Sequence, residues 1–158
     1  MPMVYRLTRV SRQFEAFTGE GAKRFGGRWN SPGLRVVYTS GARSLALLET
    51  LVHLDTAAPL PLFSFVQVEL APEDIEALPP DAFARRDDLA QSRALGDRWL
   101  RGTRSLALAV PSVIVPQEFN YLLNPAHPRF ATLRPAPPVF FELDQRLHLA
   151  PPGGVSSR

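Results

Sequence analysis

The sequence contains no cysteine and no long apolar run. Without cysteine there is no disulfide framework, no thiol nucleophile and no cysteine-ligated metal. No window approaches the roughly 20 apolar residues that a membrane-spanning helix needs, and the segment MPMVYRLTRVSR lacks the apolar core of a signal peptide. The three histidines, His53, His127 and His148, do not have the spacing of metal ligands. These absences favour a cytoplasmic protein with no metal and no membrane contact.

Lysine is nearly absent as well, because 17 of the 18 basic residues are arginine and Lys23 is the exception. GC-rich coding produces such a bias, but it does not explain where the charge lies. Residues 1–43 carry eight basic and two acidic residues, a local charge of +6 in a chain whose net charge is +3. The planar donor fork of arginine fits phosphate and carboxylate. This crowding indicates an N-terminal third suited to hold an anion such as a pyrophosphate.

A length of 158 residues, 45% of them hydrophobic, predicts one domain with one core. Local patterns predict strands over residues 4–8, 35–39, 62–70, 105–110, 112–115 and 139–143. Helices are expected over residues 42–54, with Ser40 as the cap, and over 87–101. We expect a long loop over 15–33, turns over 120–128, a domain over 1–149 and a disordered tail over 150–158. No βαβ rhythm is present, so the expected class is α+β with a single compact domain and a mixed central sheet.

The densest local signal is the glycine-rich segment that precedes the second expected strand. The pair Gly26–Gly27 lets a backbone approach a ligand closely, and Arg28 follows with donors for an anion. Trp29 offers a flat face for a ring. The alternative is a surface turn whose arginine lies in solvent, and the glycine spacing matches neither a Walker nor a Rossmann motif.

Two further polar residues lie where apolar residues are expected. Glu49 follows Leu45 by one helical turn, at the edge of the apolar stripe, so its carboxylate is predicted at the rim of a cleft. The alternative is a helix-surface pair with Arg43 or His53. Ser112 lies inside the apolar run 106–115 and needs a partner, which is either a ligand or the backbone of a turn.

Taken in order, several segments resemble the RES domain, a family named for an arginine, a glutamate and a serine. The resemblance runs from Tyr5 to His148. It is carried by YRL at 5–7, FGGRWNSPG at 25–33, VYTS at 37–40, SLALLE at 44–49, WL at 99–100, VPSVIVPQEFN at 110–120 and LNPAHP at 123–128. The order and spacing of these pieces over one domain are what make the resemblance specific.

The resemblance assigns site residues one by one. Arg28, Glu49 and Ser112 match the three residues of the family's name, Tyr38 matches a tyrosine of its site, and Arg6 matches the arginine of its first strand. The remaining residues placed at the site are Trp29 and Asn120. Phe25 departs from the pattern, since relatives often carry tyrosine there.

The resemblance also implies a fold similar to diphtheria-toxin-type ADP-ribosyltransferases and activity on NAD+. It implies the toxin of a type II toxin–antitoxin pair, neutralised by an Xre-type helix-turn-helix antitoxin, and it leaves assembly as a homodimer open. Cleavage of the nicotinamide–ribose bond builds an oxocarbenium ion that a carboxylate such as Glu49 can stabilise. Arg28, helped by Arg6, would hold the pyrophosphate or an incoming inorganic phosphate. Tyr38 and Trp29 would flank the nicotinamide, and Ser112 would orient a ribose or phosphate.

The sequence leaves the final acceptor open. Phosphorolysis, hydrolysis and transfer of ADP-ribose to a protein share the first half of the mechanism. A non-catalytic module that binds an antitoxin is the alternative from a different class. Direct binding of nucleic acid, other than through the antitoxin, has no motif to support it.

Overall fold

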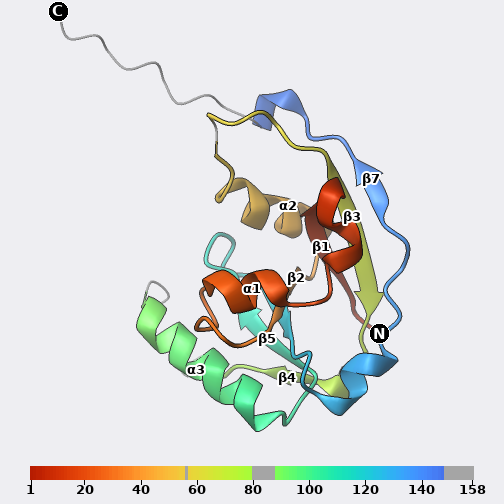
Figure 1. The fold of residues 1–158 in the computed structure, drawn as a ribbon. Helices are drawn as coiled ribbons and strands as arrows, with labels where there is room; N and C mark the ends of the chain where they lie inside the picture. The colour runs from red at the N-terminus through yellow and green to blue at the C-terminus, as the bar shows by residue number, and fades with distance from the viewer. Residues whose placement is uncertain (56, 80–87, 148–158) are drawn as a thin grey trace, which may run out of the picture.

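A seven-stranded sheet forms the centre of the computed structural model (Figure 1), which describes residues 1–55, 57–79 and 88–147. The strands are β1 (Met3–Arg9), β2 (Val37–Ser40), β3 (Phe63–Glu69), β4 (Ile75–Ala77), β5 (Ala107–Pro111), β6 (Phe119–Leu123) and β7 (Val139–Phe141). The α-helices are α1 (Glu20–Phe25), α2 (Arg43–Leu51) and α3 (Leu89–Gly102). Short 3₁₀ turns are η1 (Val10–Glu15), η2 (Pro72–Asp74), η3 (Pro128–Thr132) and η4 (Gln145–Leu147).

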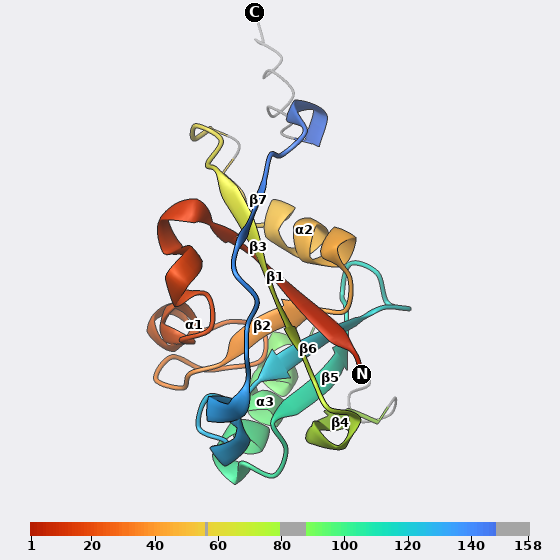
Figure 2. The ribbon, with the colours of Figure 1, turned by 90° about the vertical axis from the view of Figure 1, so that its right-hand side faces the viewer.

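The strand order β4-β5-β6-β2-β1-β3-β7 places β1 and β2 in the middle of the sheet. The β4–β5 pair is parallel and the other neighbouring pairs are antiparallel, which confirms the expected α+β class with a mixed sheet. Figure 2 shows β1 and β3 crossing β2, β5 and β6 at a steep angle. Accordingly β1 and β2 pair at one position, where Tyr5 lies opposite Ser40. Beyond that position the two strands diverge, so the sheet is split between β1 and β2.

Hydrophobic clusters fill both halves of the molecule. One cluster joins Trp29 and Trp99 to the β5 and β6 residues Val110 and Leu122. Another packs α2 against β1 and β3, with members Leu7, Ala46, Phe63, Phe65 and Leu143. Helix α2 contacts both β1 and β2, so it covers the place where the sheet opens.

Most of the predicted elements are confirmed. Strands β1, β2, β3, β5 and β7 and helices α2 and α3 lie where the sequence predicts them, although α2 ends earlier, at Leu51. Helix α3 begins at Leu89, because the Asp88 carboxylate accepts a hydrogen bond from the Gln91 amide at 3.0 Å. Residue 87 and the expected tail over 150–158 lie outside the described residues.

Several element predictions were wrong, and strand β4 was not predicted. Ser40 does not cap α2, since its hydroxyl bonds Asn120 instead. Residues 112–115 form a turn, because the Ser112 Oγ accepts hydrogen bonds from the backbone amides of Ile114 and Val115. Strand β6 was missed because Asn120 is turn-prone and turns were expected from residue 120 onward. The strand forms because its residues pair with both β5 and β2. The expected loop over 15–33 contains α1.

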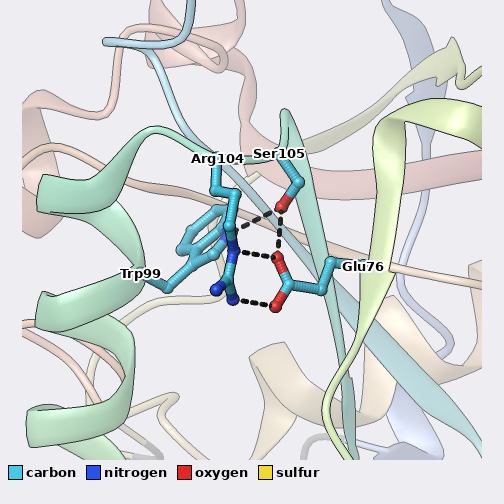
Figure 3. Close-up of polar contacts among 4 residues, drawn as sticks. All are labelled: Glu76, Trp99, Arg104 and Ser105. Atoms are coloured by element: carbon cyan, nitrogen blue, oxygen red, sulfur yellow. Dashed lines mark hydrogen bonds and ion pairs between the residues drawn. The ribbon is translucent and has the colours of Figure 1, made fainter.

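A polar cluster fixes the edge strand β4 to the end of α3 (Figure 3). The Arg104 guanidinium forms an ion pair with the Glu76 carboxylate, and Ser105 donates to the same carboxylate at 3.1 Å. The Trp99 indole N–H in turn donates to Ser105 Oγ at 2.8 Å. These contacts lie at the β4 edge of the sheet, several strands away from β1.

Candidate active site

A cavity of about 110 Å³ lies where β1 and β2 diverge under α2. The residues that line it come from β1, β2, α2 and β6: Tyr5, Arg6, Leu7, Tyr38, Thr39, Ser40, Ala46, Glu49, Thr50 and Asn120. This cavity is therefore lined by four of the sequence-predicted site residues, namely Arg6, Tyr38, Glu49 and Asn120. Because they come from four separate elements, only the sheet topology brings them together.

Two donors hold the Glu49 carboxylate at one oxygen. Ser112 Oγ donates to Glu49 Oε1 at 2.8 Å, and Asn120 Nδ2 donates to the same oxygen at 2.7 Å. Among the residues that the structure describes, no donor contacts Oε2. A carboxylate oxygen accepts through two lone pairs, so the protein satisfies Oε1, while the lone pairs of Oε2 are not used by the described residues. The alternative pairing with Arg43 is absent, since Arg43 donates to Gln67 and stacks on the Tyr5 ring.

Ser112 acts on Glu49 rather than on a ligand. Its side chain is 1% exposed, and its Oγ already accepts the amides of Ile114 and Val115 while it donates to Glu49. A hydroxyl has one proton and two lone pairs, so no capacity is left for a ribose or phosphate. The predicted ligand contact of Ser112 does not fit this geometry. The turn after Pro111, which the sequence suggested as an alternative, is what aims the hydroxyl at Glu49.

Arg6 is an enclosed cation with spare donors. Its Nη1 donates to the Tyr38 carbonyl at 3.0 Å, while its Nε is buried with no hydrogen-bond partner. Burial lowers the pKa of this guanidinium, an effect that the nearby Tyr38 opposes, and arginine still remains charged at neutral pH. Among the described residues no carboxylate forms an ion pair with it. Such a group is suited to receive an anionic ligand.

The Tyr38 hydroxyl ties β2 to the segment that carries Arg28. It donates to Asn30 Oδ1 at 2.6 Å and accepts the Trp29 amide at 3.1 Å. Burial raises the pKa of Tyr38 to about 12, while the Trp29 amide and the charges of Arg93 and Arg28 oppose that rise. These bonds use the hydroxyl proton and one lone pair, so the Tyr38 hydroxyl has no proton left to donate to a ligand in the cavity that Tyr38 lines.

Replacing Tyr38 with phenylalanine tests this tie. Loss of the hydroxyl removes the donor to the buried Asn30 oxygen and an acceptor of the Trp29 amide, so we expect the free energy of unfolding to fall by about 2 kcal/mol at pH 8. A raised pKa stabilises the fold fully below the ordinary pKa of about 10 and is lost as pH rises through the folded value of about 12. Urea unfolding across pH 8 to 12 should therefore show the two proteins converge. A difference that stays constant over this range would contradict the assignment.

The segment 26–34 that carries Arg28 is held on several sides. Asn30 is completely buried, and its Nδ2 donates to the carbonyls of Ala22, Ser31 and Leu34 at 2.8, 3.2 and 3.1 Å. Helix α3 adds a hydrogen bond from Arg93 Nε to the Gly27 carbonyl at 2.8 Å. These contacts give the segment a defined conformation rather than that of a solvated surface turn.

Asp97 of α3 completes this attachment. Its carboxylate accepts the Ser31 amide at 2.8 Å and the Ser31 hydroxyl at 2.6 Å. Arg28 itself is half-buried and lies close enough to Tyr38 to lower the pKa of that hydroxyl. Arg28 does not line the cavity with Glu49. The structure thus places Arg28 and Glu49 near the same tyrosine, but it does not bring them into contact.

Trp29 lies in the hydrophobic core. Its side chain is 3% exposed and belongs to the hydrophobic cluster that contains Trp99 and Leu122. A ring enclosed in this way does not favour the predicted flanking of a nicotinamide by Trp29, which stays a prediction. Its apolar bulk anchors the Arg28 segment in the core.

A second cavity of about 120 Å³ lies on the other side of Arg6. Its walls include Arg6, Arg12, Arg24 and the acidic residues Glu15 and Glu20. Glu20 is paired with Arg35 at 2.8 Å. The rim carries Phe25, whose ring is 74% exposed and faces the Arg24 guanidinium at 6.0 Å. Three arginines of the arginine-rich N-terminal third therefore line this cavity.

Two other features are absent from the described residues. No group of three or more histidine, aspartate or glutamate side chains there could hold a metal ion. Nor does that part of the chain contain a helix with the length and apolar character needed to span a membrane.

Comparison with known proteins matches this arrangement to one family. A family model described as the RES domain matches residues 3–145. The protein "Toxin Res" of Yersinia enterocolitica is 39% identical over 150 residues, which cover 92% of this chain and 99% of that protein. The "Prs ADP-ribosylating toxin" of Sphingobium sp. is 40% identical over 134 residues, which cover 78% and 83%.

The fold is also shared with a solved structure. The M. tuberculosis MbcT–MbcA toxin–antitoxin complex contains a chain that superposes with a TM-score of 0.73 at 20% identity, covering 92% of this chain and 86% of that one. At this identity the likeness concerns the fold. The family model and the two sequence relatives together confirm the resemblance found in the sequence, and the chain belongs to the RES domain family.

Proposed function

We propose that the protein is a toxin that consumes NAD+ by cleaving the nicotinamide–ribose bond. The observation that carries this proposal is Glu49, which lines the cavity and whose Oε1 is held by Ser112 and Asn120, while no donor among the described residues contacts Oε2. A fixed carboxylate is suited to a reaction in which positive charge develops on a sugar carbon. Glu49 lines the same cavity as the half-buried cation Arg6, which suits a substrate that joins a ribose to a phosphate.

In the proposed reaction the bond between the ribose C1′ and the pyridinium nitrogen breaks, and both electrons leave with nicotinamide. The ribose then carries oxocarbenium charge, which the Glu49 carboxylate stabilises electrostatically without reorganising. The ring of Tyr38 forms an apolar wall for the nicotinamide end. Arg6 and Arg28 neutralise the pyrophosphate, or the inorganic phosphate that attacks C1′ when phosphate is the acceptor.

The names of the relatives support this class of activity. One is called an ADP-ribosylating toxin, another is called Toxin Res, and the shared fold occurs in a toxin–antitoxin complex. The proposed partner is therefore an antitoxin of the Xre helix-turn-helix type, and the proposed place of action is the cytoplasm. Transfer of ADP-ribose to a cellular protein is the second candidate, favoured by the 40% identity to the Prs ADP-ribosylating toxin.

Product analysis distinguishes these outcomes. The purified, antitoxin-free protein is incubated with NAD+, with and without inorganic phosphate, and the products are identified by mass spectrometry. We expect free nicotinamide, together with ADP-ribose-1″-phosphate for phosphorolysis or ADP-ribose for hydrolysis. Adding a cell lysate and labelled NAD+ reports transfer to protein. If none of these products forms, the proposed activity is wrong and a non-catalytic antitoxin-binding module becomes the better reading.

The placement of Arg6 predicts how the dinucleotide lies. We assign the cavity that Glu49 lines to the nicotinamide end, where the bond breaks. Arg6 lines both this cavity and the second one. A pyrophosphate at Arg6 would therefore direct the adenosine end toward Arg12 and Arg24.

Replacing Arg12 or Arg24 with glutamine tests this orientation. Each exposed arginine contributes modestly to anion binding, so we expect KM for NAD+ to rise about threefold with kcat unchanged. Nicotinamide mononucleotide lacks the adenosine end, so its cleavage should be unaffected. Arg134→Gln is the control, because Arg134 donates to the nearby carbonyls of Ala131 and Leu133 and lines neither cavity. Equal effects on both substrates would contradict the orientation.

A further inference from the structure

Ser40 is a buried serine at the end of β2 that the sequence assigned to helix capping. Its side chain is 4% exposed, and its Oγ lies 2.7 Å from Asn120 Oδ1. Ser40 and Asn120 occupy directly opposite positions in the antiparallel β2–β6 pair. Cross-strand neighbours of this kind are held at a fixed separation by the backbone ladder. The Ser40–Asn120 contact is thus set by strand register and not by a mobile loop.

The donor and acceptor roles in this contact are forced by Glu49. An ionised carboxylate can only accept hydrogen bonds, so the Asn120 group 2.7 Å from Glu49 Oε1 must be the amide nitrogen. The amide oxygen of Asn120 then faces Ser40, and Ser40 must donate its proton to it. If the Asn120 amide turned over, its oxygen would face the carboxylate oxygen and its NH₂ would face the hydroxyl. The Ser40 donor favours the orientation in which Asn120 holds Glu49.

We infer that Ser40 is a positioning residue for the proposed reaction: through the chain Ser40–Asn120–Glu49 it keeps the Asn120 amide oriented and the Glu49 carboxylate in place. This inference rests on the proposed function of Glu49. Ser40 lines the cavity, but the proton of its hydroxyl is committed to Asn120, so it has no donor for the substrate and acts through its neighbour. Glu49 is then fixed from two directions, by Ser112 in the turn after β5 and by Asn120 on β6.

The test uses Ser40→Ala, Ser40→Cys and Ser40→Thr. The alanine variant loses the donor, the cysteine variant keeps the size but donates weakly, and the threonine variant keeps the hydroxyl. We expect Ser40→Ala to lower kcat for NAD+ cleavage about tenfold with KM within twofold, since the loss concerns placement of Glu49 and not binding. Ser40→Cys should be intermediate, and Ser40→Thr should retain most of the activity.

Ser64→Ala is the matched control. Ser64 is 2% exposed, lies on β3, and donates to an amide oxygen, Gln13 Oε1, at 2.8 Å. Neither Ser64 nor Gln13 lines the Glu49 cavity. Ser64→Ala therefore removes the same kind of buried bond, with a comparable fall in melting temperature, and should leave kcat unchanged.

A double-mutant cycle with Asn120→Ala decides whether Ser40 acts through Asn120. In the Asn120→Ala background, Ser40→Ala should cause no further loss of kcat, because the link to Glu49 is already gone. Independent, multiplicative losses would overturn the inference, as would Ser40→Ala activity equal to that of Ser64→Ala. If the wild-type protein does not cleave NAD+ at all, the proposed function itself fails and this inference with it. If Ser40→Ala does not fold, the cysteine and threonine variants still give the ordered series.

Discussion

Glu49→Gln is expected to lower kcat for NAD+ cleavage by about 100-fold or more while leaving the fold intact. Glutamine has the shape of glutamate, and its amide oxygen can accept the hydrogen bonds that Ser112 and Asn120 now donate to Oε1. The side chain therefore stays in place, and what disappears is the negative charge that faces the developing oxocarbenium ion. Because this charge matters most in the transition state, the loss should fall on kcat more than on KM.

The measurement is the rate of nicotinamide release from NAD+, with the melting temperature recorded for each variant. Glu49→Asp is the companion variant, since it keeps the charge but withdraws it by one methylene from both donors. We expect it to retain more activity than Glu49→Gln. Undiminished NAD+ turnover in a well-folded Glu49→Gln protein would remove Glu49 from the mechanism and with it the central part of the proposed function.

The parts of the site that follow local periodicity were predictable from the sequence. Glu49 lies one turn beyond the buried Leu45 on α2, and this spacing puts it at the edge of the apolar stripe, although it also allows a helix-surface pair with Arg43 or His53. The β-prone alternation over residues 4–8 likewise predicts β1 and places Arg6 on it. Both predictions depend only on neighbours within one element, which is what a single sequence records.

The parts that depend on contacts between distant segments were not predictable in the same way. Asn120 is a turn-prone residue, and only its pairing opposite Ser40 across β2 and β6 makes it a partner of Glu49. Trp29 is equally consistent with a ligand face and with a core position, and the choice is made by α3, which is distant in the chain. Ser112 needed a partner by the logic of burial, yet its sequence neighbourhood does not contain Glu49.

One overlooked signal was available, namely a glycine inside the predicted helix α3. An isolated glycine in a helix lowers the stability of the helix by about 1 kcal/mol relative to alanine. Its presence therefore indicates that another segment packs closely against the helix at that position. A Cβ atom built on Gly96 would lie 1.7 Å from the Trp29 carbonyl oxygen and 2.7 Å from the Trp29 carbonyl carbon. The backbone of the Arg28 segment thus lies directly against α3, and Gly96 is what permits it.

Gly96→Ala is therefore expected to destabilise the protein strongly. The backbone atoms at Trp29 cannot rotate away as a side chain would, so the segment 26–34 or α3 must shift by more than 1 Å. Overpacking of this kind costs about 3 kcal/mol or more and outweighs the better helix propensity of alanine. Urea unfolding monitored by far-UV circular dichroism measures the loss.

Gly102→Ala on the same helix is the matched control. A Cβ atom on Gly102 would meet nothing within 4 Å, so this substitution should be neutral or stabilise the protein by up to about 1 kcal/mol. A second readout connects the contact to the site. Gly96→Ala displaces the segment that positions Arg28, so at a temperature where the variant remains folded its KM for NAD+ should rise, whereas that of Gly102→Ala should not. Equal stability of the two variants would mean that α3 does not fix the Arg28 segment. An unchanged KM in a destabilised Gly96→Ala protein would mean that the Arg28 segment does not contribute to substrate binding.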